Sequence, residues 1–138
     1  MATAAIETAT GSRNSVRIGW ALSGFSIAFL ALDAGGKLIA PEAMIAYSPP
    51  LGIPADPTFY RELGLILAIC TALYAWPRTQ VLGAVLLTGY LGGAVATHLR
   101  VGSPLLSNTL FGVYLGLLVW GGIWLREPRL RGLFPFKD

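Results

Sequence analysis

Residues 63–99 read LGLILAICTALYAWPRTQVLGAVLLTGYLGGAVATHL, and their pattern indicates the type of fold. It contains two long apolar runs that are separated by Pro77-Arg78. A bilayer core is about 30 Å thick, and a helix needs about 20 residues to cross it. Proline interrupts a helix because it lacks the N–H group that continues the hydrogen-bond ladder. The stretch therefore predicts two antiparallel transmembrane helices that are joined by a tight turn.

The composition of the whole chain also indicates a membrane protein. Of its 138 residues, 54% are hydrophobic and 12% are charged, whereas a soluble domain carries about 25% charged residues. Mean hydropathy is +0.63. The net charge of +3 does not indicate nucleic-acid binding, because the basic residues stand at the ends of apolar runs.

Further apolar runs complete an all-α membrane protein with an up-down bundle of four transmembrane helices. We expect a transmembrane domain over residues 16–126, with spans at about 17–40, 59–76, 79–99 and 105–125. A disordered tail (1–15) precedes this domain, and a cytoplasmic tail (127–138) follows it. The long loop 41–58 holds five prolines and is a candidate cover for the mouth of the bundle.

The distribution of lysine and arginine predicts the orientation of the bundle. Three of these residues fall on one side of the membrane, namely Lys37, Arg61 and Arg100, and the other seven fall on the side of both termini. Loops that are rich in lysine and arginine stay in the cytoplasm. We therefore expect both termini in the cytoplasm.

Two glycine pairs, Gly89 with Gly93 and Gly112 with Gly116, have the spacing of close helix contacts. Small residues four positions apart let two membrane helices approach each other. We expect these glycines to pack against neighbouring helices, and the alternative is ordinary apolar filling.

With this topology, polar residues from all four spans gather at the outer side. They are Asp33, Lys37, Arg61, Glu62, Thr97, His98, Arg100 and Asn108. A charged group at the bilayer centre costs at least about 2.5 kcal/mol, so such groups face inward and pair. Asp33 and Lys37 are four residues apart and share a helix face, which predicts an ion pair.

We interpret this cluster as a pocket for acid–base chemistry. The expected catalytic residues are His98, Glu62 and Asp33, because a histidine beside a carboxylate is a common general acid or base. The expected substrate-binding residues are Lys37, Arg61, Arg100, Asn108 and Thr97. Taken singly, each of these residues has a structural explanation, such as a helix ion pair or an arginine that reaches the headgroups. No metal site or cofactor is expected, since the cations would repel a metal ion.

Four stretches resemble the DoxX-like membrane proteins: GGKL (35–38), REL (61–63), GYLGGAVATHLRVGSP (89–104) and WLREPRL (124–130). The resemblance implies a four-helix bundle in a bacterial cytoplasmic membrane. Some members of the wider family that it resembles are subunits of thiosulfate:quinone oxidoreductases. Others are linked to oxidative stress or thiol metabolism. It assigns no catalytic residue, and the single cysteine, Cys70, argues against thiol exchange.

Three hypotheses for the function follow. The first is a membrane enzyme or binding protein for a small lipophilic molecule, which it isomerises, cyclises or hydrolyses. The second is an accessory subunit of a quinone-linked oxidoreductase, and the third is a purely structural protein. The expected partners are the lipid bilayer and the lipophilic substrate or quinone, without nucleic acid and with a possible second copy of the chain.

Overall fold

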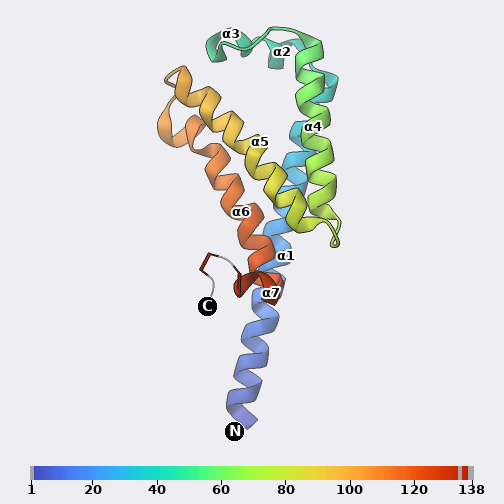
Figure 1. Ribbon diagram of the computed structural model, residues 1–138, viewed down its shortest axis with the longest axis vertical. Coiled ribbons are helices and arrows are strands. Elements are labelled where there is room, and N and C mark those ends of the chain that lie inside the picture. Colours follow the sequence, from blue (N-terminus) through green and yellow to red (C-terminus); the bar gives the residue numbers. More distant parts are fainter. Residues whose placement is uncertain (1, 134, 137–138) are drawn as a thin grey trace.

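The computed structural model describes residues 2–133 and 135–136, and four long helices dominate this part of the chain (Figure 1). They are α1 (Ala2–Ile39), α4 (Pro57–Ala75), α5 (Gln80–Arg100) and α6 (Phe111–Arg126). Four segments are long and apolar enough to cross a membrane, namely Ser12–Ile39, Pro57–Ala75, Gln80–Arg100 and Leu105–Arg126. The predicted all-helical fold with four spans is confirmed.

The ends of α4 follow from local chemistry. The Asp56 side chain caps the helix by accepting a hydrogen bond from the Thr58 backbone N–H at 3.0 Å, and Pro57 occupies the first turn. At the other end Trp76 is extended, as a residue before proline tends to be. The Thr79 hydroxyl then donates to the carbonyl of Leu73 at 2.8 Å, which closes the turn into α5.

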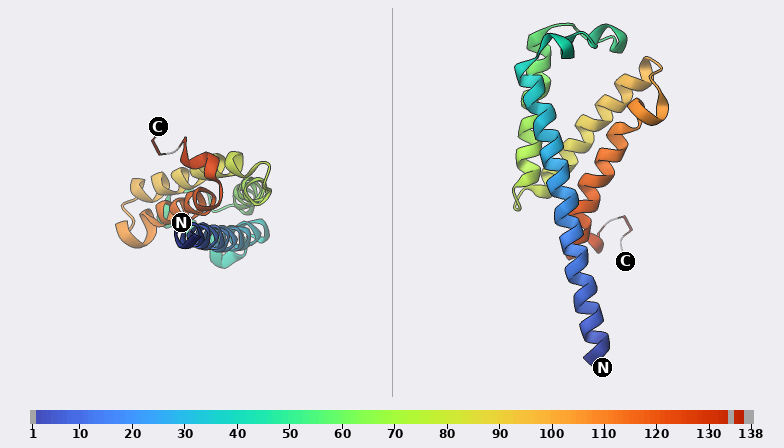
Figure 2. Two further views of the ribbon diagram at one scale, coloured as in Figure 1. Left: turned by 90° about the horizontal axis from the view of Figure 1, so that it is seen from below. Right: turned by 180° about the vertical axis from the view of Figure 1, so that it is seen from behind.

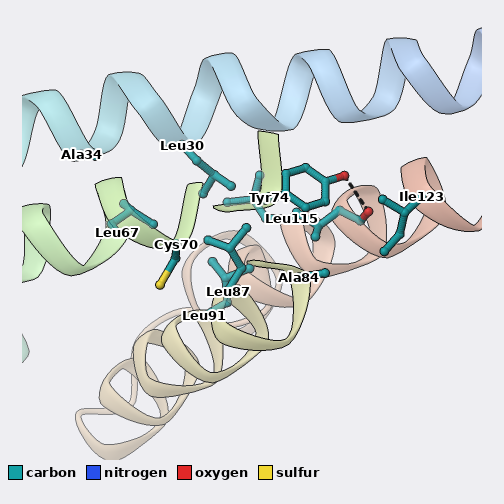
Figure 3. Packing of buried hydrophobic residues seen from close by; sticks show 11 residues of the cluster. Leu30, Ala34, Leu67, Cys70, Tyr74, Ala84, Leu87, Leu91, Leu115 and Ile123 are labelled. Carbon is teal, nitrogen blue, oxygen red and sulfur yellow. Dashed lines mark hydrogen bonds between the residues drawn. The ribbon is translucent and has the colours of Figure 1, made fainter. Parts of the chain in front are cut away.

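The four helices form a ring in which each contacts two neighbours. Helix α1 packs on α4 and α6, and α5 packs on the same two helices from the other side. The core holds fully buried side chains from all four, and Figure 3 shows their packing around Tyr74. Its largest members are Leu30, Leu67, Tyr74, Leu87 and Ile123.

One end of the ring is tightly packed. We call it the closed end; it holds the turn 76–79 and the start of the C-terminal segment after α6. A Cβ on Gly83 would lie 2.2 Å from the Tyr74 nitrogen, and a Cβ on Gly122 would lie 2.3 Å from the Ser23 Oγ. Only glycine allows such approaches, so these two positions bring α4 against α5 and α1 against α6.

At the opposite end the helix pairs diverge, as Figures 1 and 2 show. We call this the open end; it holds residues 40–56 and 101–110. Two short helices, α2 (Glu42–Ile45) and α3 (Ser48–Leu51), run across it within the predicted loop 41–58. The start of the fourth span is a π-helical turn, η1 (Leu105–Thr109), which follows Pro104. Such turns are frequent at functional sites.

The N-terminal segment differs from the disordered tail that was expected over residues 1–15. Helix α1 begins at Ala2, so residues 2–15 are helical, whereas Met1 lies outside the described residues. Alanine has the highest helix propensity, and extending an existing helix avoids the cost of nucleation. After α6, the short helix α7 (Pro128–Arg131) folds back, and its Arg131 donates to the Trp124 carbonyl at 2.9 Å and to the Ser15 hydroxyl at 3.2 Å.

Candidate functional site

A cavity of about 620 Å³ occupies the open end of the ring. This volume lies within the range of about 300–1,000 Å³ that is usual for small-molecule sites. All four long helices and the segment with α2 and α3 contribute to its lining. The buried leucines Leu30, Leu91 and Leu115 make up its apolar part next to the core.

The predicted ion pair on α1 forms part of the cavity wall. The Lys37 ammonium contacts the Asp33 carboxylate, and the two side chains are 17% and 32% exposed. The spacing of four residues places both on one helix face, as expected from the sequence. The cation and the anion therefore neutralise each other at the edge of the cavity.

His98 enters the cavity from the last turn of α5. Its Nδ1 lies 3.0 Å from the Ser103 hydroxyl, which follows the turn after the helix. Among the described residues, none forms a hydrogen bond with Nε2. A neighbour that holds one ring nitrogen orients the imidazole, and the second nitrogen is then available to a ligand.

Asn108 also lines the cavity and comes from the π-helical turn. Its Oδ1 accepts a hydrogen bond from the Ser107 hydroxyl at 2.7 Å, so its amide nitrogen keeps two donors. Thr97 lines the cavity too, but its hydroxyl donates to the Gly93 carbonyl at 2.9 Å. Thr97 therefore adds shape to the wall, while Asn108 adds hydrogen-bonding capacity.

The structure does not bring Arg61 and Glu62 to the cavity. Both are exposed on α4, and neither lines the site. Residues Tyr60, Gly64 and Leu67 are buried on the inner face of this helix, and the two charged positions fall on the other face. The expected pairing of Glu62 with a cation is absent among the described residues, where the Asp33–Lys37 contact is the ion pair found.

Arg100, expected to contact the substrate, does not line the cavity. Its Nη2 donates to the carbonyls of Leu51 and Gly52, each at 3.0 Å. Gly52 has a φ of +63°, a backbone conformation that favours glycine. A second contact joins the Ser48 hydroxyl to the Tyr60 hydroxyl at 2.7 Å. These two contacts hold the α2–α3 segment over the cavity, where it contributes Met44, Tyr47, Leu51 and Ile53.

Of the four glycines that were expected to pack against neighbouring helices, only Gly112 does so. A Cβ on Gly89 or Gly93 would meet nothing within 4 Å, and both residues line the cavity. Of the second pair, a Cβ on Gly112 would lie 3.0 Å from the Leu91 carbonyl oxygen, whereas Gly116 faces open space. The missing side chains of Gly89 and Gly93 therefore provide room for the cavity rather than a close approach.

Tyr90 is a cavity residue that the sequence analysis missed. It lies next to Gly89, is half-buried, and its hydroxyl has no hydrogen-bond partner among the described residues. Asp33 lies within electrostatic range of it. The available signal was a tyrosine in the middle of the third span, a position remote from the usual aromatic belt at the membrane surface.

The fold and the cavity define a multi-pass membrane protein of four helices with a largely apolar pocket at one end. A family model described as the DoxX-like family matches residues 21–122, which covers all four spans in whole or in part. The chain belongs to the DoxX-like family. No curated protein matches the chain. No solved structure matches it either.

Proposed function

We propose that this protein binds a small lipophilic molecule in the open-end cavity and transforms it by acid–base chemistry. The observation that carries the proposal is a cavity with largely apolar walls and a few polar groups along it. Leu30, Leu91 and Leu115 provide the apolar contact, and Asp33, Lys37 and His98 provide the polar groups. This combination is typical of sites that bind and orient a lipophilic ligand.

In the proposed chemistry, His98 transfers the proton. An imidazole both accepts and donates a proton, and Nε2 has no hydrogen-bond partner among the described residues. The Asp33–Lys37 pair provides a fixed dipole beside the reacting group, in surroundings where electrostatic effects are stronger than in water. A group that transfers a proton and a fixed dipole beside it can assist the isomerisation, cyclisation or hydrolysis of a lipophilic substrate. Glu62 has no part in this scheme, because it lies outside the cavity.

The proposed orientation places the cavity in the outer half of a bacterial cytoplasmic membrane. The closed end carries Arg78, Arg126, Arg129 and Arg131, and basic residues favour the cytoplasmic side. The Arg126 guanidinium lies 4.0 Å from the ring centre of Trp20. An aromatic residue therefore lies at the same depth as this arginine, as is usual near a membrane surface. Ligands then enter from the outer leaflet or from the space beyond it. Assembly with a second copy of the chain stays a prediction.

Two adjacent glycines of α5 offer a matched test of the binding site. Gly93 lines the cavity and Gly92 does not, and a Cβ on either would meet nothing within 4 Å. Gly93→Leu fills the cavity, whereas Gly92→Leu places the same side chain elsewhere on the same helix. Lipophilic molecules that co-purify with the protein are extracted and identified by mass spectrometry.

We expect the wild type and Gly92→Leu to retain the same molecule and Gly93→Leu to lose it. Equal retention by both variants would contradict binding in this cavity. A retained quinone would favour the accessory-subunit hypothesis over acid–base turnover. With the molecule identified, His98→Ala should abolish its conversion and Glu62→Gln should leave the conversion unchanged.

A further inference from the structure

We infer that the cavity selects an uncharged amphiphile whose oxygen accepts a hydrogen bond from Tyr90 beside the Asp33–Lys37 pair. The inference rests on the proposed function, because it names the class of ligand for the same cavity. It excludes carboxylates, sulfonates and phosphates as ligands of this cavity.

The first step is the charge balance of the cavity wall. Among the described residues, the wall carries one carboxylate and one ammonium group, and these are already paired with each other. Arg61 is exposed on the far face of α4, and Arg100 binds two backbone carbonyls of the α2–α3 segment. Apart from His98, which is charged only while it holds a proton, no spare cation of the described residues faces the cavity to compensate an anionic ligand.

The second step is the cost of placing a charge there. Moving a charged group out of water is strongly unfavourable unless a counter-charge or several hydrogen bonds replace the lost hydration. A charged head at this site competes with one member of the Asp33–Lys37 pair for its partner. An uncharged oxygen needs only a hydrogen-bond donor and leaves the ion pair intact.

The third step is the donor itself. The Tyr90 hydroxyl has no partner among the described residues, although it is half-buried in a largely apolar wall. A phenol in such surroundings usually finds a partner, and a ligand oxygen supplies one. The open positions at Gly89 and Gly93 leave room beside it. The hydrocarbon part of the ligand then lies against Leu91 and Leu115.

Competition between three ligands of equal chain length tests the inference. The purified full-length protein in lipid nanodiscs is labelled with an aliphatic alcohol that carries a photoreactive diazirine, and labelled residues are mapped by mass spectrometry. Octanol, octanesulfonate and octyltrimethylammonium compete at equal concentrations in the bilayer. For the wild type we expect octanol to compete at least about tenfold better than either ion.

Variants that remove one charge of the ion pair should change which compound competes best, and the remaining charge sets the direction of the change. Asp33→Asn leaves Lys37 without its anion, so octanesulfonate should become the best competitor. Lys37→Met leaves Asp33 alone, so octyltrimethylammonium should become the best. The double variant has no charge again and should return to octanol, which also shows that the cavity is still formed. Tyr90→Phe should weaken octanol about tenfold without a gain for either ion.

The outcomes separate this inference from the proposed function. Suppose that the photoreactive alcohol labels the cavity of the wild type, and that octanesulfonate competes with it as well as octanol or better. This result overturns the inference but leaves the proposed binding function intact. An unchanged order of competitors in Asp33→Asn also overturns it. Absence of any labelling at cavity residues overturns both.

Discussion

Replacing Tyr74 with phenylalanine tests the packing at the closed end, on which the shape of the cavity depends. The Tyr74 hydroxyl donates to the Val119 carbonyl at 2.8 Å, a bond that Figure 3 marks within the core. A phenol has one hydrogen, so the Ser23 hydroxyl, 2.8 Å away, donates to the Tyr74 oxygen. Tyr74→Phe removes both bonds and leaves the rest of the ring in place.

The size of the effect follows from these two bonds. Side-chain hydrogen bonds between membrane helices contribute roughly 0.6 kcal/mol each on average. Ser23 is fully buried, so it also loses a partner that water does not replace. We therefore expect Tyr74→Phe to lower the free energy of unfolding by about 1–2 kcal/mol.

The assay is reversible unfolding in mixed detergent micelles, followed by circular dichroism or by steric trapping. Tyr114→Phe is the matched control, because the Tyr114 hydroxyl donates one exposed bond to the Leu106 carbonyl. A double-mutant cycle with Ser23→Ala measures the coupling between the two hydroxyls. The reasoning is refuted if Tyr74→Phe costs no more than Tyr114→Phe, or if Ser23 and Tyr74 show no coupling.

Two further predictions concern the open end and the α5–α6 contact. Arg100→Ala removes two hydrogen bonds to the α2–α3 segment, so amide exchange in residues 46–53 should accelerate severalfold, while the exposed control Arg61→Ala should not change it. Equal exchange in both variants would show that Arg100 does not hold the segment. Gly112→Leu overpacks the contact with Leu91 and should cost about 1–3 kcal/mol of unfolding free energy. Gly116→Leu, which faces open space, should be nearly neutral, and the opposite order would contradict the packing described.

The helices were predictable from the sequence because the bilayer imposes a length on each apolar run. The Asp33–Lys37 contact was predictable for a similar reason, since two residues four apart share a face in any α-helix. Both conclusions depend on local geometry alone. They need no knowledge of how one helix is rotated against another.

Which residues line the cavity was only partly predictable, because this depends on how one helix is rotated against another. Glu62 was expected near His98 because both lie at a similar depth in the membrane. However, Tyr60 and Gly64 occupy the buried face of α4, so Glu62 points away from the ring. Glycine spacing is likewise ambiguous, since a missing side chain allows either a close contact, as at Gly112, or an empty space, as at Gly93. The sequence pattern is the same in both cases.

The most direct measurement is a cryo-electron microscopy map of the protein extracted with its native lipids. We expect density that belongs to no residue of the chain, located beneath α2 and α3 and touching Tyr90, His98 and Leu115. A map in which side chains fill that space, or in which His98 and Asp33 face bulk water, would contradict it.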